Sequence, residues 1–168
     1  MADISLFLVR HAIAADRGDD WPDDGKRPIT SEGAAKMRRA IAGLRALDVK
    51  LDIVFTSPLT RAMETAELIV SGLKPAPALK PLPALAPGGT PARIAEAIVA
   101  EKDVRTIALV GHEPGLGELA GWLIGARTPL LFKKGGICRI DVAELPPGRT
   151  GQLVWFATPK MLRALGHR

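Results

Sequence analysis

The chain has 168 residues, of which 47% are hydrophobic and 24% are charged. This length and composition fit one globular domain spanning residues 1–168, and they exclude a largely disordered chain. The net charge of +5 is spread along the sequence and only 4% of residues are aromatic, so we expect a basic surface and no nucleic-acid partner.

Cysteine usage and the N-terminus bear on the cellular compartment. The single Cys138 cannot form an internal disulfide, which fits a reducing compartment. No basic stretch precedes the first apolar run, and that run ends at Arg10, unlike a signal peptide. No run approaches the roughly 20 apolar residues of a membrane span. We therefore expect a cytoplasmic, monomeric protein with no membrane partner.

Strand and helix patterns alternate in the first part of the chain. An apolar run predicts a strand over residues 4–9, and a helical spacing of apolar residues predicts a helix over 30–47. A second strand is predicted over 52–56, and a helix over 59–73 follows it. This alternation is typical of an α/β fold with a parallel sheet.

A proline-rich segment interrupts the pattern. Residues 74–91 contain six prolines, which exclude a helix there and allow only a short edge strand near 79–82. Beyond them the spacing predicts a helix over 90–100, a strand over 106–110 and a helix over 117–124.

The periodicity changes near the C-terminal end. Polar and apolar residues alternate over 138–142, and a second strand pattern over 153–157 follows turn-forming residues. This predicts an antiparallel pair at the edge of the sheet. The expected fold is a three-layer α/β/α domain with a mostly parallel sheet and an antiparallel edge.

Two of the three histidines directly follow buried-strand patterns. His11 follows the first strand beside Arg10, and His112 follows the strand over 106–110. Arg61 begins the helix after the second strand, where backbone N–H groups are free. If these three strands are neighbours, all four side chains lie at one rim of the sheet, where open α/β sheets place their sites.

This set of residue types suits a phosphoryl group. Arginine forks and free N–H groups bind phosphate oxygens, and a neutral imidazole is a competent nucleophile near pH 7. A second histidine, when protonated, would add a donor and a charge. Each residue alone also fits a structural role, such as a hydrogen-bonded histidine or a solvated arginine. The convergence of four of them favours a site.

The sequence resembles the histidine phosphatase superfamily in three segments. They are Leu-Val-Arg-His at 8–11, Thr-Ser-Pro-Leu-Thr-Arg-Ala-Met-Glu-Thr-Ala at 56–66 and Val-Gly-His-Glu-Pro at 110–114. The compact length, Arg-Pro-Ile-Thr at 27–30 and Phe-Lys-Lys-Gly-Gly at 132–136 are similar to the small SixA-type phosphohistidine phosphatases. The resemblance covers nearly the whole chain and implies a phosphoglycerate mutase-like fold.

The resemblance implies a role for each matching residue. His11 would attack phosphorus and carry the phosphoryl group, while Arg10, Arg61 and His112 bind its oxygens and stabilise the transition state. Arg27 would reach the phosphate pocket from the first loop. Water would then hydrolyse the phosphohistidine enzyme, with no metal and no cofactor. The implied partner is a histidine-phosphorylated signalling protein of a bacterial relay, and phosphate and its analogues are the implied ligands.

Two departures from the family pattern stand out. Ala12 replaces the glycine that usually follows the Arg-His pair, and residues 82–89 contain no carboxylate where phosphoglycerate mutases carry an acid. An alkoxide leaves poorly without a proton, whereas a protonated imidazole leaves readily, so the missing acid favours phosphohistidine as substrate. Asp16, Asp19 and Glu113 are possible substitute acids, although Glu113 also suits a helix start.

Other functions stay open on this evidence. A small-molecule phosphomonoesterase and a non-catalytic phosphate sensor both fit the same residues. Residues 115–120 match the loose dinucleotide-binding pattern G-x-G-x-x-A, but an antiparallel pair follows where that fold has an acidic residue after a parallel strand. We expect these glycines to serve the turn and the packing of the helix on the sheet.

Two charged segments have no assigned role. Five aspartates lie between Asp16 and Asp24, and they fit either a solvated, mobile loop or a lid that senses substrate. Their spacing does not match an EF-hand loop. Lys133 and Lys134 would contact an acidic partner or cover an edge of the sheet.

Overall fold

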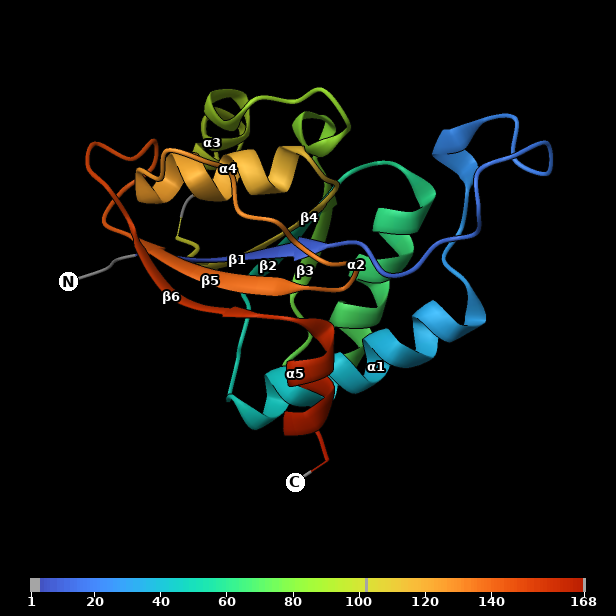
Figure 1. Ribbon diagram of the computed structural model, residues 1–168. Coiled ribbons are helices and arrows are strands. Elements are labelled where there is room, and N and C mark those ends of the chain that lie inside the picture. The colour runs from blue at the N-terminus through green and yellow to red at the C-terminus, as the bar shows by residue number, and fades with distance from the viewer. Residues whose placement is uncertain (1–3, 102, 168) are drawn as a thin grey trace.

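The computed structural model describes residues 4–101 and 103–167. Its six strands form one sheet in the order β3-β2-β4-β1-β5-β6 (Figure 1). The strands are β1 (Ile4–Arg10), β2 (Ile53–Thr56), β3 (Ala78–Pro81), β4 (Thr106–Gly111), β5 (Ile137–Val142) and β6 (Gln152–Ala157). The first four are parallel, and β5 runs antiparallel to β1 and β6. The predicted parallel sheet with an antiparallel edge is confirmed.

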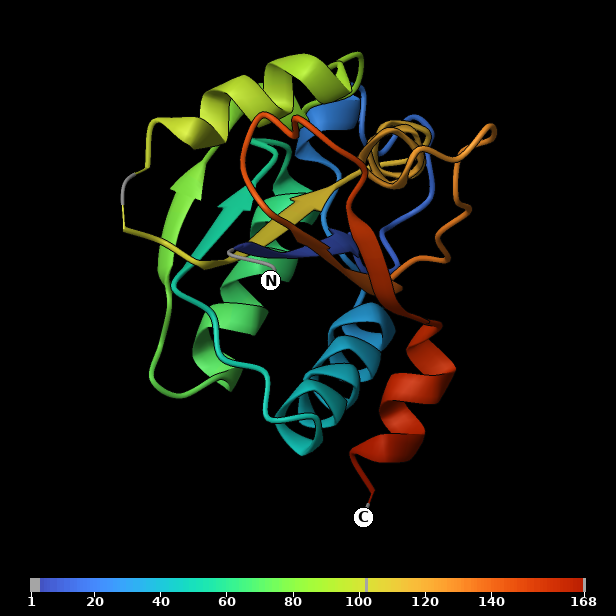
Figure 2. The same cartoon turned by 90° about the vertical axis from the view of Figure 1, so that its left-hand side faces the viewer.

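Five α-helices cover the two faces of the sheet. They are α1 (Ser31–Ala46), α2 (Thr60–Gly72), α3 (Pro91–Val99), α4 (Gly115–Ile124) and α5 (Pro159–Leu165). Helices α1, α2 and α5 lie on one face, and α3 and α4 lie on the other (Figures 1 and 2). Two short 3-10 turns, Asp24–Lys26 and Pro83–Leu85, lie in the loops. In the described residues, no helix is long and apolar enough to cross a membrane.

Alternate residues of the central strand serve two hydrophobic cores. Leu6 and Leu8 of β1 pack into the core beneath α3 and α4. Phe7 and Val9 pack into the core beneath α1, α2 and α5. Because both faces of β1 are buried, its sequence reads as a continuous apolar run.

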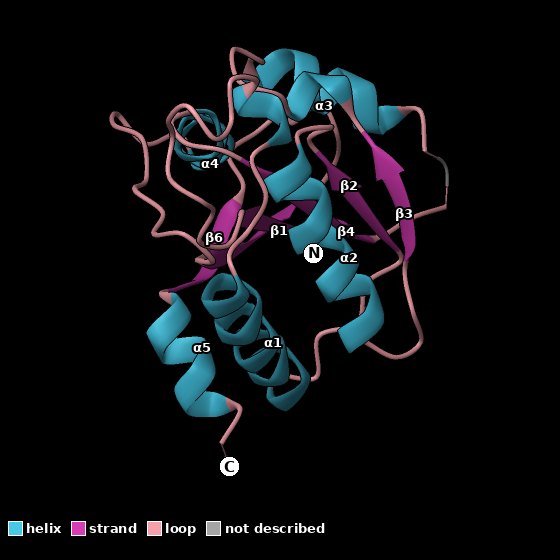
Figure 3. Ribbon diagram, turned by 90° about the vertical axis from the view of Figure 1, so that its right-hand side faces the viewer, coloured by secondary structure: helices cyan, strands magenta, loops and turns pink. Residues whose placement is uncertain are grey.

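The strand order brings three chain segments together. Strand β4 lies between β1 and β2, so the neighbours assumed from the sequence are confirmed. In register, Arg10 pairs with Gly111 and Thr56 with Val110, which aligns the carboxyl ends of the three strands (Figure 3). His11, Ser57 and His112 are each the first residue after their strand.

The loop between β1 and α1 is closed at its base. Ala15 N–H donates to the Pro28 carbonyl at 2.8 Å, and Thr30 N–H donates to the Ile13 carbonyl at 2.9 Å. Gly33 permits this approach, since a Cβ there would lie 2.2 Å from the Ile13 carbonyl oxygen. The loop therefore holds residues 16–27 over the rim of the sheet.

Candidate active site

A cavity of about 460 Å³ opens at the carboxyl ends of β1 and β4. All four residues expected at one rim line it, together with Arg27. Its charged and histidine side chains are Arg10, His11, Asp16, Arg17, Asp24, Arg27, Arg61, His112, Glu113 and Lys134. The cavity is thus dominated by cationic groups and imidazoles, which suits an anionic ligand.

His11 is a buried, neutral imidazole with one nitrogen free to react. Its Nδ1 lies 2.7 Å from the Ala12 carbonyl oxygen. A carbonyl can only accept, so Nδ1 carries the proton and Nε2 keeps its lone pair. Burial lowers the pKa of His11 to about 4, and Arg61, Arg10 and Lys134 act in the same direction, against the Ala12 hydrogen bond that raises it. At neutral pH, Nε2 is therefore an available nucleophile.

His112 faces His11 across the cavity, with ring centroids 5.2 Å apart. The Ser57 Oγ lies 2.7 Å from Nε2 of His112 and accepts a hydrogen bond from Leu59 N–H at 3.2 Å. Burial lowers the pKa of His112 to about 3, and His11, Arg61 and Arg10 act in the same direction against Asp24, so its ring is neutral. The Ser57 hydroxyl can donate to Nε2 while it accepts from Leu59 N–H, and in that arrangement the ring proton of His112 lies on Nδ1.

The charge that protonation would give the second histidine is disfavoured at this position. Desolvation and the nearby positive groups oppose protonation of His112. Its Nδ1–H nevertheless remains a hydrogen-bond donor. The side chain of His112 can therefore orient a ligand through a hydrogen bond without carrying a full positive charge.

Arg10 and Arg61 are held by backbone carbonyls. Arg10 Nη1 donates to the Phe132 carbonyl at 2.7 Å, and Arg61 Nη1 donates to the Asp24 carbonyl at 2.9 Å. Thr65 ties α2 to the end of β1, because its hydroxyl donates to the Arg61 carbonyl and accepts from Ala12 N–H. Both guanidinium groups are thus positioned before any ligand binds.

Three buried nitrogens at this site lack hydrogen-bond partners. They are Nε of Arg10, Nε of Arg61 and Nδ1 of His112, and they make up the full set of such buried side-chain atoms in the described part of the chain. An unsatisfied buried donor costs about 1–3 kcal/mol. That all three belong to expected site residues indicates a cluster of donors arranged for an acceptor-rich ligand.

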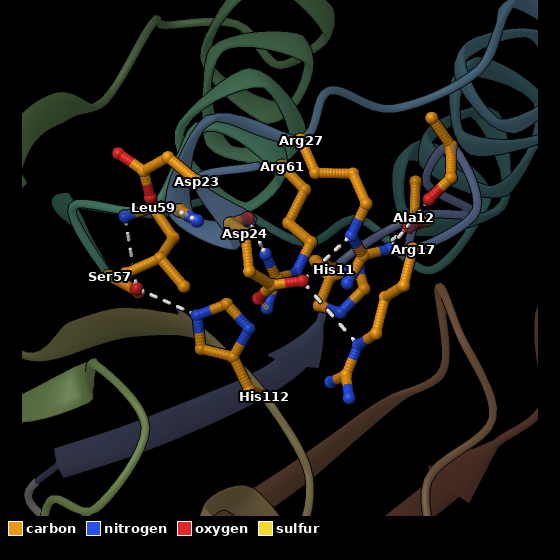
Figure 4. Close-up of polar contacts among 12 residues, drawn as sticks. His11, Ala12, Arg17, Asp23, Asp24, Arg27, Ser57, Leu59, Arg61 and His112 are labelled. Carbon is orange, nitrogen blue, oxygen red and sulfur yellow. Dashed lines mark hydrogen bonds and ion pairs between the residues drawn. The ribbon is translucent and has the colours of Figure 1, made fainter. Parts of the chain in front are cut away.

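Asp24 is a site residue that the sequence analysis did not single out. Its carboxylate forms ion pairs with Arg61 at 3.2 Å, Arg27 at 3.0 Å and Arg17 at 3.4 Å (Figure 4). Burial raises the pKa of Asp24, but the Arg27 hydrogen bond and the charges of the three arginines outweigh it, and the pKa is lowered. The acidic loop is therefore not solvated throughout, because one of its five aspartates is bound by the arginines of the cavity.

The suggested substitute acids lie in different surroundings. Asp16 lines the cavity and is exposed, whereas Asp19 is exposed and does not line it. Both carboxylate oxygens of Glu113 accept backbone hydrogen bonds, from Gly117 N–H at 2.7 Å and Phe132 N–H at 3.2 Å. Residues 82–89, the segment without carboxylates, border the cavity through Pro87.

The glycine pattern in α4 has a packing explanation. A Cβ at Gly117 would lie 2.0 Å from the Leu130 carbonyl oxygen, while a Cβ at Gly115 would meet nothing within 4 Å. Gly117 thus lets α4 approach the segment after it, rather than the sheet as expected. The strand that follows, β5, is antiparallel to β1, which does not fit a dinucleotide-binding unit.

Comparison with known proteins identifies the family. The sequence model of the histidine phosphatase superfamily (branch 1) matches residues 6–86. An uncharacterised protein of the cyanobacterium Picosynechococcus is 34% identical, with the match covering 95% of this chain and 99% of that protein. The phosphohistidine phosphatase SixA of Escherichia coli is 27% identical over 96% of this chain and 100% of its own length. The chain belongs to the histidine phosphatase superfamily.

A solved structure supports this assignment. The protein histidine phosphatase SixA complexed with tungstate superposes with a TM-score of 0.83 at 26% identity, covering 94% of this chain and 98% of the other. The SixA-type resemblance of the sequence is thus confirmed, and the fold is phosphoglycerate mutase-like. The protein is a phosphatase of the hydrolase class.

The sequence analysis missed two residues of this histidine phosphatase site, Ser57 and Asp24. Ser57 carried a signal, since it is a hydroxyl residue directly after the strand predicted over 52–56. Nothing local distinguishes Asp24 from the other four aspartates of its loop. Its position follows from the turn at Asp24–Lys26, which Asp23 caps by accepting a hydrogen bond from Gly25 N–H at 2.9 Å.

Proposed function

We propose that this phosphatase hydrolyses phosphohistidine on a protein, through a covalent intermediate on His11. The observation that carries the proposal is the set of three unpartnered nitrogens on Arg10, Arg61 and His112, three side chains that line the same cavity as His11. A phosphoryl group supplies acceptor oxygens for such donors and an electrophilic phosphorus for such a nucleophile. The similarity to SixA, which binds tungstate in a solved structure, supports the same assignment.

In the first step, Nε2 of His11 attacks phosphorus. The new N–P bond forms as the N–P bond to the substrate imidazole breaks, and the electron pair of the broken bond goes to the leaving nitrogen. The substrate ring keeps the proton on its other nitrogen and departs as neutral imidazole. The Ala12 carbonyl accepts a hydrogen bond from Nδ1 of His11 and stabilises the positive charge that develops on that ring.

In the second step, water attacks the phosphorus of the phosphorylated His11. The N–P bond breaks, its electron pair returns to Nε2, and both hydrogens of the water leave with the phosphate. Arg10 and Arg61 bind the equatorial oxygens throughout, while the His112 Nδ1–H donates to them. The enzyme returns to its starting tautomer.

The acids near the cavity favour a nitrogen leaving group. Asp24 is kept ionised by its arginines and cannot serve as a proton donor at neutral pH. Glu113 is engaged by two backbone N–H groups, and residues 82–89, which reach the cavity through Pro87, contain no carboxylate. An ester oxygen requires a proton as it departs, whereas an imidazole that already carries one does not.

The test compares a histidine-phosphorylated protein with an aryl phosphate ester, using wild type and His11→Ala. We expect faster phosphate release from the phosphohistidine protein, and loss of that release in His11→Ala. Faster release from the ester, still dependent on His11, would instead indicate a phosphomonoesterase, with the exposed Asp16 as its acid. Phosphate binding without release from either substrate would indicate a sensor.

A further inference from the structure

A second cavity of about 490 Å³ lies beside the catalytic one. It is a groove between α1, α5 and the turn at residues 133–135, which follows the loop after α4. Its volume is within the range of sites that bind whole ligands or peptide side chains. Neither the phosphoryl chemistry nor the comparisons assign a role to it.

All charged side chains that line the groove are basic. Six basic residues reach it and no Asp or Glu does; the six are Arg10, Lys36, Lys133, Lys134, Lys160 and Arg163. Lys36 forms an ion pair with Glu32 at 2.7 Å. Within residues 4–101 and 103–167, the last four of the six have no acidic partner within ion-pair distance. Cations gathered this way repel one another unless an acidic group comes between them.

The floor of the groove is apolar. Ala12, Met37 and Ala40 line it and are buried. Gly135, with φ of +81°, lies where a Cβ would be 3.8 Å from the Met37 sulfur and 3.6 Å from Pro159. No aromatic side chain lines the groove, so it offers no platform on which nucleic-acid bases would stack.

The groove joins the catalytic cavity through two residues. Arg10 and Lys134 line both. The connecting turn is fastened to the end of β1, because Gly135 N–H donates to the carbonyls of Arg10 at 3.1 Å and His11 at 3.0 Å. The groove and the catalytic cavity are therefore adjacent, so a protein whose phosphoryl group lies at His11 can also reach the groove.

We propose that this groove docks an acidic, amphipathic helix of the phosphohistidine-bearing protein, which rests on the proposed function. Acidic side chains of that helix pair with Lys133, Lys160 and Arg163, and its small apolar side chains contact the floor. An apolar floor with a cationic rim matches a helix with one apolar and one acidic face. The partner must also present a phosphorylated histidine next to this helix, which a nucleic acid does not.

The test uses the double charge reversal Lys160→Glu with Arg163→Glu. Neither residue belongs to the catalytic machinery, and both are placed by α5 alone. The matched control is Arg38→Glu with Arg39→Glu, which makes the same change of charge at exposed positions of α1 outside the groove. Two substrates are compared, a histidine-phosphorylated phosphotransfer domain with an acidic phosphorylation-site helix and free phosphoramidate.

We expect the reversal in α5 to raise KM for the phosphorylated domain by about tenfold and to leave kcat/KM for phosphoramidate unchanged. The variant with Lys160→Gln and Arg163→Gln should give a smaller rise of the same kind. Equal KM values for the α5 reversal and its control would overturn docking. A loss of activity on both substrates would indicate misfolding, and the glutamine variant, which removes the two positive charges without introducing negative ones, would then decide.

A binding measurement separates this proposal from the proposed function. The unphosphorylated domain is titrated into wild type and into both reversals. If wild type hydrolyses neither substrate, the proposed function fails. The docking proposal is judged separately, because it requires that the unphosphorylated domain binds wild type and does not bind the α5 reversal. A single-stranded RNA is titrated in the same way. If the RNA binds wild type and loses affinity in the α5 reversal, while the affinity of the domain is the same for both proteins, the assignment of a protein partner would be overturned.

Discussion

The hydroxyl oxygen of Ser57 lies 2.7 Å from Nε2 of His112. While it accepts from Leu59 N–H, the hydroxyl still has its own proton to donate to Nε2. When it donates, the proton of His112 lies on Nδ1, the nitrogen without a partner in the described structure. We therefore propose that Ser57 is a positioning residue that acts through His112.

Removal of the Ser57 hydroxyl should therefore impair the site. We expect Ser57→Ala to lower kcat/KM for the phosphohistidine protein by about tenfold, since one hydrogen bond that orients a catalytic ring is lost, on the order of 1–2 kcal/mol. Nitrogen NMR of His112 should show the Nδ1–H tautomer in wild type and a mixture in the variant. Ser71→Ala is the control, because that exposed hydroxyl only donates to the Leu68 carbonyl within α2. An unchanged tautomer in Ser57→Ala would refute this role.

The neutral histidines make stability depend on pH. The pKa values of His11 and His112 in the folded protein are lowered to about 4 and about 3, against 6.5 for an ordinary histidine. Between pH 6.5 and 4 the unfolded chain therefore binds more protons than the folded one, so stability rises with pH in this window and is lost as pH falls through it. Urea unfolding across this range should show that slope.

The variant His11→Asn tests directly whether His11 causes this pH dependence of stability. Replacing one of the two neutral histidines removes its share of the proton uptake, so the free energy of unfolding should depend less steeply on pH between 6.5 and 4. His167, which is exposed, supplies the matched control variant His167→Asn. Equal slopes for all three proteins would mean that His11 is protonated normally in the folded state.

The sequence predicted the elements that depend on local patterns. Strands β1 and β4 are apolar on both faces, so their runs and the histidines that end them were visible without a structure. Helix α5 was not predicted, because Leu162 is its only fully buried residue and no amphipathic period results. Its position depends on Gly43 of α1, where a Cβ would lie 2.1 Å from the Leu162 carbonyl oxygen. Such a contact between distant segments has no local signature.

Some site residues could likewise be predicted from local sequence patterns, and others depend on contacts between distant segments. The four expected at the rim were found because each adjoins a strand end or a helix start, and the structure places them around one cavity. Asp24 could not be chosen from five aspartates, since its ion pairs with two arginines of its own loop and with Arg61 of α2 depend on how the loop folds back. The direction of the His112 ring likewise depends on Ser57, 55 positions away in the sequence.

Asp24 should compete with the phosphoryl group for the same arginines. We expect Asp24→Asn to bind inorganic phosphate about fivefold more tightly at low salt, because one negative charge beside the site is removed, and the gain should shrink as salt rises. Calorimetric titration measures this. The control is Asp23→Asn, which alters only the cap of the adjacent turn. Weaker phosphate binding by Asp24→Asn would show that the carboxylate organises the arginines more than it competes with phosphate.

The two glycines of α4 provide a matched pair for a stability measurement. Gly117→Ala should destabilise the fold by about 2 kcal/mol or more, because the new Cβ collides with the Leu130 carbonyl. Gly115→Ala meets open space and should be neutral or stabilise by about 0.5 kcal/mol. Denaturant unfolding of both variants checks this. If Gly117→Ala is as stable as Gly115→Ala, then the packing explanation for the glycine pattern is wrong.

The central claim is that His11 carries the phosphoryl group, and rapid quenching tests it most directly. Wild type is mixed with a radiolabelled phosphohistidine protein, stopped with alkali within milliseconds and digested. We predict a transient label, stable in alkali and labile in acid, on the peptide that contains His11, and none in His11→Ala. Full turnover with no label on that peptide, or with the label on another residue, would contradict the mechanism.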